Sequence, residues 1–170
     1  MQSVNPYPLL VAGVSGSGKS TLAQSWAQRC AAPFIEADVF HSPASVAKMR
    51  AGIALEDADR SDWLDRLVAE ARARAGPSAP VLACSALKRS YRGRLRAGIP
   101  GLHVVLMEVS HALAMERVAH RPGHYMPVTL VDSQFRTLER PTDEPDTLVL
   151  DASRHNDELL ELIDQWLVAA

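Results

Sequence analysis

The stretch Leu9–Ser20, LLVAGVSGSGKS, joins a short apolar run to a glycine-rich loop that ends in a lysine and a serine. The loop matches the pattern G-x-x-x-x-G-K-[ST], whose glycines let the backbone wrap around a phosphate with its N–H groups pointing inward. The apolar run before the loop has the character of a buried strand, and TLAQSWA after the loop has the pattern of a helix. The positive end of that helix's dipole would also favour the bound phosphate. This context predicts a nucleoside triphosphate site and argues against an incidental turn.

The loop also assigns roles to individual residues. Lys19 is expected to reach the β- and γ-phosphates and to compensate the charge of the transferring group, which makes it a candidate catalytic residue. Ser20 offers its hydroxyl to Mg²⁺. The residues expected to bind ATP are Gly13, Ser15, Gly16, Ser17, Gly18, Lys19, Ser20 and Thr21.

The overall composition limits the class of protein. The length of 170 residues predicts one domain over residues 1–170, and the net charge of -2 gives no basic excess that would favour nucleic acid as a partner. We find no secretory leader and no apolar stretch of about eighteen residues, so we expect a cytoplasmic protein with no membrane partner. Cys30 and Cys84 lack metal-ligand spacing and are expected to be buried free thiols.

Apolar runs alternate with amphipathic stretches along the chain, as in β-α units. Buried strands are predicted at about 8–12, 33–37, 80–84, 102–107 and 146–150. Helices are predicted over 19–31, 59–75, 86–97, 110–120, 129–139 and 155–168. The sequence therefore predicts an α/β fold, with a mainly parallel five-stranded sheet and helices on both faces, whose ligands bind at the carboxyl ends of the strands.

Asp38 follows the second predicted strand and is the best candidate for the group that handles an acceptor hydroxyl. Its carboxylate could accept the hydroxyl proton and contribute to the Mg²⁺ shell, although an aspartate here could instead cap a helix. We interpret the spacing of Glu36 and Asp38 as placing their carboxylates on opposite sides of the segment, so that only one of them faces the nucleotide. His41 is a candidate hydrogen-bond partner of a substrate hydroxyl, with a purely structural role as the alternative.

Several cations are candidates for binding the acceptor. Lys48 and Arg60 lie in a segment, about 39–64, that we expect to form the acceptor-binding insertion, and arginine suits a planar carboxylate. Ser85 and Lys88 follow the third strand and form a second candidate anion site. For the charged insertion, a solvated helix face is the alternative.

Residues of about 117–129 join two helical patterns and contain Pro122 and Gly123, which predicts a mobile lid. Arg121 is expected to reach the transferring phosphoryl group when the lid closes, and Arg117 to lie against the adenine. A solvated helix end is the alternative for both arginines.

Together these motifs resemble the gluconokinase family of small P-loop carbohydrate kinases, from about Leu9 to Leu150. Besides the loop, the resemblance rests on Asp38-x-x-His41, Lys48-Met49-x-x-Gly52, Asp57-x-Asp59-Arg60-x-x-Trp63-Leu64, Cys84-Ser85-Ala86-Leu87-Lys88-x-x-Tyr91-Arg92, Gly123-His124-Tyr125-Met126 and Ser133-Gln134-Phe135-x-x-Leu138-Glu139-x-Pro141. It implies a P-loop NTPase fold, ATP-dependent phosphorylation of D-gluconate at its terminal hydroxyl, substrate contact by Gln134, and a cytoplasmic homodimer.

The sequence departs from the family around the acceptor. Glu36-Ala37-Asp38 stands where the family has D-G-D, and His41-Ser42 where it has H-P; Ser45, Ala54 and Asp62 replace Asn, Pro and Pro. Another sugar acid is therefore an alternative acceptor. A shikimate or nucleotide kinase is a second alternative, although Cys84-Ser85-Ala86 replaces the glycine triplet of shikimate kinases. A nucleotide-binding regulatory module without turnover is the third.

Overall fold

The structure is a computed structural model that describes residues 4–123 and 127–170. In these ranges the strands are β1 (Leu9–Ala12), β2 (Phe34–Glu36), β3 (Val81–Ala83), β4 (His103–Glu108) and β5 (Thr147–Asp151). The helices are α1 (Lys19–Arg29), α2 (Pro43–Arg50), α3 (Asp57–Ala73), α4 (Arg89–Gly98), α5 (His111–Ala119), α6 (Thr129–Thr137) and α7 (Asn156–Val168), with a 3-10 turn η1 (Ala37–Phe40).

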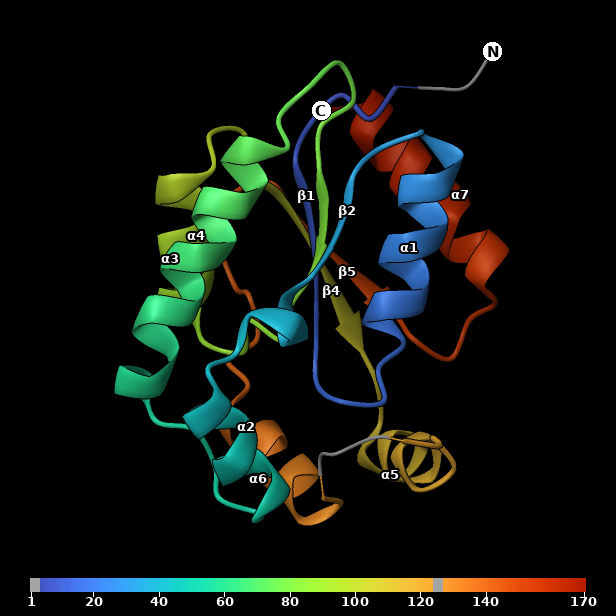
Figure 1. Cartoon of the computed structure of the whole chain (residues 1–170). Helices are drawn as coiled ribbons and strands as arrows, with labels where there is room; N and C mark the ends of the chain where they lie inside the picture. Colours follow the sequence, from blue (N-terminus) through green and yellow to red (C-terminus); the bar gives the residue numbers. More distant parts are fainter. Residues whose placement is uncertain (1–3, 124–126) are drawn as a thin grey trace.

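Within the described residues, the strands form one parallel sheet in the order β2-β3-β1-β4-β5. The central strand β1 pairs Leu10 with Leu82 of β3 and with Val104 of β4. Helices α1 and α7 cover one face of the sheet, and α3 and α4 cover the other (Figure 1). The predicted fold class is confirmed, and each strand boundary lies within one residue of its expected position.

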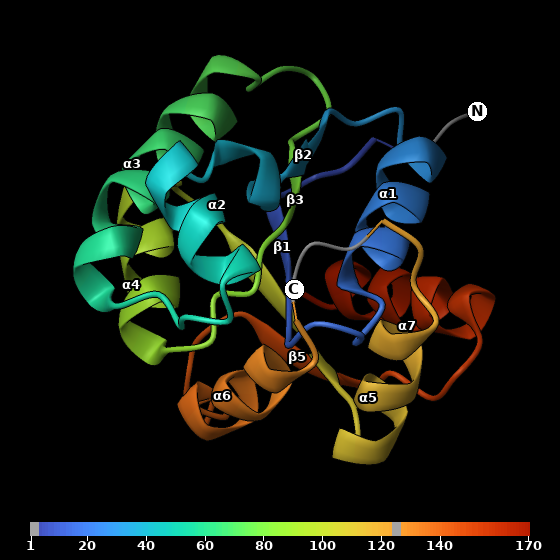
Figure 2. The same cartoon turned by 60° about the horizontal axis from the view of Figure 1, so that its bottom comes forward.

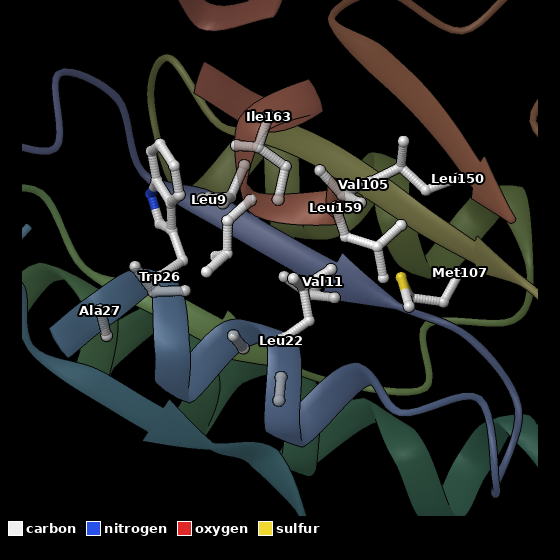
Figure 3. Packing of buried hydrophobic residues seen from close by; sticks show 14 of the residues in the cluster. Leu9, Val11, Leu22, Trp26, Ala27, Val105, Met107, Leu150, Leu159 and Ile163 are labelled. Atoms are coloured by element: carbon white, nitrogen blue, oxygen red, sulfur yellow. The ribbon is translucent and has the colours of Figure 1, made fainter. Parts of the chain in front are cut away.

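The core consists of two layers, one on each face of the sheet, because successive strand residues point to opposite faces. Leu9 and Val11 of β1 pack with Trp26 of α1 and Ile163 of α7 (Figure 3). Leu10 belongs to the other layer, beneath α3 and α4. Strands β1, β3 and β4 are buried on both sides, which explains their apolar runs, while the edge strands β2 and β5 are partly buried.

Helix α2 was not predicted. Ser42 caps it by accepting a 3.1 Å hydrogen bond from the Ser45 N–H, and Pro43 occupies the first turn, where its missing N–H costs nothing. The helix ends at Gly52, where φ is 76° and the next N–H, of Ile53, donates to the Lys48 carbonyl. Only Ser45 and Met49 of this helix are buried, so its sequence carries little amphipathic pattern.

Beyond the carboxyl ends of the strands lie α2, α5 and α6, gathered at one end of the molecule (Figure 2). Helix α5 precedes the predicted lid and α6 follows it. The central lid residues His124–Met126 of the family motif lie outside the described residues. No helix in the described part is long and apolar enough to cross a membrane.

Candidate active site

The phosphate loop connects β1 to α1, and its backbone needs glycine at defined positions. Gly16 has φ of 79°, and a Cβ there would lie 2.5 Å from the Ala114 carbonyl oxygen of α5. The Lys19 side chain follows at the start of α1, and the residue is only 8% exposed. The Ser17 hydroxyl is buried without a hydrogen-bond partner among the described residues. The loop therefore forms a tight concave surface with an unsatisfied polar group, as a phosphate site requires.

A pocket of about 600 Å³ opens on the outer side of this loop. Arg117 forms one wall, donating to the Gly16 carbonyl at 3.3 Å and to the Ala152 carbonyl at 2.9 Å. Arg121 lines the same pocket, as do Gly16, Ser17, Gly18, Lys19, Ser20 and Thr21 of the predicted ATP site. The volume suits a nucleotide.

The segment Ala152–Asn156 also lines this pocket, and we did not predict it from the sequence. It follows β5 directly, at the same edge of the sheet as the phosphate loop. The rule that ligands bind beyond the carboxyl ends of parallel strands would have identified it.

A second, smaller pocket of about 60 Å³ lies on the inner side of the loop. The predicted site residues that line it are Ser15, Lys19, Asp38, His41, Arg60, Ser85 and Gln134. Lys19 lines both pockets. The two pockets therefore meet at the side chain that was expected to act on the transferring phosphoryl group.

Arg60 supplies a positive charge to the inner pocket. Its guanidinium lies 5.8 Å from the Trp63 ring centre and 5.5 Å from that of Tyr91, and these rings hold it in place. The Arg60 Nε is buried and has no hydrogen-bond partner among the described residues. A partly buried guanidinium whose buried Nε has an unused donor is suited to bind an anionic ligand.

The other two predicted cations are engaged elsewhere. Lys48 Nζ lies 2.8 Å from Asp59 Oδ1, and Lys88 Nζ lies 2.8 Å from Asp57 Oδ1. Neither lysine is among the residues that line the inner pocket. Both aspartates belong to the first turn of α3, where negative charge is favourable, so this turn attracts the lysines.

His41 lies beside the aromatic wall of the inner pocket. Its ring stacks on Trp63 with centres 4.3 Å apart, and its Nε2 lies 4.0 Å from Asp38 Oδ1. Burial lowers the pKa of His41 to about 4; the Asp38 carboxylate opposes this shift and Arg60 adds to it. The imidazole is therefore neutral near pH 7, able to donate one hydrogen bond and accept another.

The expected separation of Glu36 and Asp38 is wrong. Residues two apart in an extended segment point to the same face, so the spacing of Glu36 and Asp38 gives no reason to separate them, and the chain enters η1 at Ala37. Asp38 lines the inner pocket, while Glu36 interacts with the hydroxyl of Ser20. Burial raises the pKa of Glu36, and the Ser20 hydroxyl partly offsets this. Asp38 also does not cap a helix, because it lies inside η1 and Ser42 caps α2.

The chemistry of these groups fits Mg²⁺. Ser20, Glu36 and Asp38 offer hard oxygen ligands, and Glu36 Oε1 is buried without a hydrogen-bond partner among the described residues. The described residues contain no cluster of three or more His, Cys, Asp or Glu that would form a metal centre alone. This agrees with the way Mg²⁺ is held in phosphotransferases, by one or two protein groups together with substrate phosphates.

Gln134 connects the inner pocket to the phosphate loop. Its Oε1 accepts a hydrogen bond from the Ser15 N–H at 2.6 Å. Because Gln134 belongs to α6, this contact links the helix after the lid to the loop.

Comparison with known proteins adds independent information. A family model described as an AAA domain matches residues 9–145. The gluconokinase of Gluconobacter oxydans (strain 621H) is 41% identical over 162 residues, covering 93% of this chain and 89% of that protein. The thermosensitive gluconokinase of Escherichia coli (strain K12) is 36% identical over 162 residues, covering 94% of this chain and 87% of that protein.

A solved structure is similar over almost the whole chain. It is a gluconokinase from Sinorhizobium meliloti 1021, with 40% sequence identity and a TM-score of 0.85 over 98% of this chain and 94% of that chain.

Proposed function

This chain belongs to the gluconokinase family, and from that premise we propose that it transfers the γ-phosphoryl group of ATP to the terminal hydroxyl of D-gluconate, giving 6-phospho-D-gluconate and ADP. The observation that carries the proposal is the position of Lys19 in the wall of both pockets. A nucleotide in the outer pocket and a sugar acid in the inner pocket would meet at this ammonium group.

On the nucleotide side, the loop backbone and Lys19 bind and orient the phosphates. Ser20 and Glu36, with Asp38 nearby, would hold Mg²⁺, which supplies charge neutralisation on the β- and γ-phosphates when bound. We propose that Arg117 contacts the base; Arg117 and Arg121 both line the outer pocket, and both belong to the predicted lid. We propose that lid closure brings Arg121 to the transferring group.

On the acceptor side, Arg60 binds the substrate carboxylate, and neutral His41 and Gln134 bind its hydroxyls. Asp38 accepts the proton of the attacking hydroxyl, while Lys19 compensates the charge that develops on the phosphoryl group. Ser85 lies in the same wall. Lys48 and Lys88 contribute more remotely, through their ion pairs with the start of α3.

Acceptor-stimulated ADP release tests this function across a panel of aldonates, glucose, shikimate and nucleoside monophosphates. We expect gluconate to be preferred, with kcat/KM at least about a hundredfold above that of glucose, because a buried cation left without its anion is costly. A preference for shikimate or a nucleotide would overturn the assignment. ATP binding without stimulated ADP release would indicate a regulatory module.

The expected homodimer and cytoplasmic location are also proposals, drawn from the family resemblance. Sedimentation velocity of the purified protein tests the first, and fractionation of cells that express it tests the second.

A further inference from the structure

The turn Ser85–Lys88, between β3 and α4, holds an unfavourable backbone conformation at the inner pocket. Ala86 has φ of 41°, in the left-handed region that residues with a Cβ rarely adopt, and it is completely buried. Ser85 and Leu87, on either side of it, both line the inner pocket. Surrounding contacts must therefore hold the strained turn in place.

Arg92 provides two of these contacts through its side chain. Its side chain is fully buried, and its Nη1 donates to the carbonyls of Ala86 and Leu87 at 2.9 and 3.0 Å. Its Nη2 donates to the Glu139 carbonyl at 2.8 Å, and both Nη2 and Nε donate to the Glu144 carboxylate, at 2.6 and 3.0 Å. All five N–H groups of the guanidinium thus have partners.

Glu144 balances this buried charge. Its side chain is 2% exposed; burial alone would raise its pKa, but hydrogen bonds from Arg92 and Arg96 outweigh burial and lower the pKa below its ordinary value. The carboxylate is therefore ionised opposite Arg92. A buried ion pair of this kind is weak evidence for stability, but it fixes geometry.

The same turn joins the two sides of the site. Gly13 of the phosphate loop donates its N–H to the Ser85 carbonyl at 3.2 Å, and Glu139 donates its N–H to the Leu87 carbonyl at 2.8 Å. Glu139 follows α6, the helix that contributes Leu130 and Gln134 to the inner pocket. The contacts of Arg92 thus reach two walls of this pocket, and none of its partners lines the nucleotide pocket.

We propose that Arg92 is a positioning residue for the acceptor, which holds the turn Ser85–Lys88 against the segment after α6 and so fixes the shape of the inner pocket. The proposal rests on the gluconokinase activity proposed above. It predicts a defect in acceptor binding and phosphoryl transfer that is larger than any defect in ATP binding.

The primary test compares Arg92→Lys with Arg96→Lys. Lysine keeps the charge opposite Glu144 but cannot reproduce the forked contacts to the turn. Arg96 is a matched control, because it lies on the same helix and binds Glu144 at 2.8 Å but contacts neither Ala86 nor Leu87. We expect Arg92→Lys to raise the KM for gluconate about tenfold, with the KM for ATP changed less than about twofold. Arg96→Lys should leave both within about twofold.

A second variant tests the role of the strain. Glycine adopts a φ of 41° without steric cost, so Ala86→Gly reduces the need for an external constraint. In the Arg92→Lys background, Ala86→Gly should lower the raised KM for gluconate by at least about threefold. General destabilisation would not produce this rescue. If Arg92→Lys does not fold, Glu144→Gln replaces it as the test, because it weakens the anchor of Arg92. We expect Glu144→Gln to raise the KM for gluconate more than the KM for ATP, as expected for Arg92→Lys.

Hydrogen exchange separates the failure of this proposal from the failure of the proposed function. Lack of gluconate phosphorylation by the wild type would overturn the function, while exchange over residues 84–95 would still report on the turn. This exchange should be faster in Arg92→Lys than in Arg96→Lys. Equal exchange in the two variants, equal KM changes for both substrates, or no rescue by Ala86→Gly would overturn the role of Arg92.

Discussion

Lys19 stands at the boundary of the two pockets, and its charge acts where phosphoryl transfer takes place. Replacing it with methionine keeps the length of the side chain but removes the ammonium group. We expect Lys19→Met to lower kcat by about a thousandfold or more, because this charge stabilises the transition state most strongly. Steady-state ADP release measures the loss, and a melting temperature close to that of the wild type would show that the fold is intact. Turnover near the normal rate would contradict the assignment of the site.

We propose that Arg60 determines whether the inner pocket binds a carboxylate. Its buried, unpartnered Nε predicts that Arg60→Ala lowers kcat/KM for gluconate by about thirtyfold or more and changes the poor reaction with glucose much less. The measurement is the ratio of the two kcat/KM values. Arg66→Ala is a matched control, since Arg66 lies on the same helix, is exposed and does not line the pocket. An unchanged gluconate-to-glucose ratio in Arg60→Ala would contradict the carboxylate contact.

His41 makes stability depend on pH. Because its pKa is about 4 in the folded protein, below the ordinary value of 6.5, the unfolded chain binds the proton more readily between these values. Its contribution to stability is therefore full above pH 6.5 and is lost as the pH falls towards 4. We expect a loss of about 2 kcal/mol between pH 7 and pH 4.5.

Urea unfolding of the wild type and His41→Asn at both pH values measures this difference. The variant should lose less stability over the same interval, because asparagine does not titrate there. Identical losses in the two proteins would show that other groups cause the pH dependence.

At the residue scale, the sequence predicted a residue's role where that role follows from a motif. It did not predict the role where several nearby charged side chains compete for the same partner. The phosphate loop defines its own geometry, so its residues could be predicted one by one. Whether Lys48, Lys88 or Arg60 faces the acceptor depends on which cation the first turn of α3 attracts, and Asp57 and Asp59 attract the lysines. Glu36 was misplaced for a different reason: residues two apart in an extended segment share a face, so its spacing from Asp38 does not separate the two carboxylates.

At the scale of elements, the central strands β1, β3 and β4 were predictable because burial on both faces makes them apolar runs. Helix α2 was not, because it is eight residues long and buries only two of them. Its start depends on a serine cap followed by proline, a combination that also begins turns. Short helices that form the rim of a site are selected by tertiary contacts more than by their own sequence.

The predicted lid, about 117–129, carries Arg121, which is exposed and lines the outer pocket. We expect Arg121→Ala to lower kcat by at least about tenfold more than it weakens ATP binding, because an arginine brought in by closure acts mainly in the transition state. Turnover and equilibrium nucleotide binding measure the two effects. Equal effects on both would give Arg121 a ground-state binding role. Exchange in α5 and α6 should also slow when both substrates are present.

At the scale of the whole molecule, the order of the strands brings distant parts of the sequence to one edge of the sheet. Residues that follow β1, β2, β3 and β4 line the inner pocket, and residues that follow β1, β4 and β5 line the outer one. The alternation of strands and helices along the chain predicted that these strand ends lie together. It did not predict which side chains pair with one another there. The hydrogen bond from the Ser15 N–H to Gln134 Oε1 joins the loop to α6 at the inner pocket, and Lys19 lines both pockets.

This arrangement predicts that the two substrates bind cooperatively. A nucleotide analogue that cannot transfer phosphate orders the loop, and with it Ser15 and Lys19, which also line the acceptor pocket. We expect the analogue to raise the affinity for gluconate by about fivefold or more, and gluconate to raise the affinity for the analogue by the same factor, because coupling between binding sites is reciprocal. Isothermal titration calorimetry in both orders of addition measures the two factors, with glucose as the control ligand. If each affinity is the same with and without the other ligand, the two binding sites are not coupled. Each pocket would then be rigid before its ligand binds.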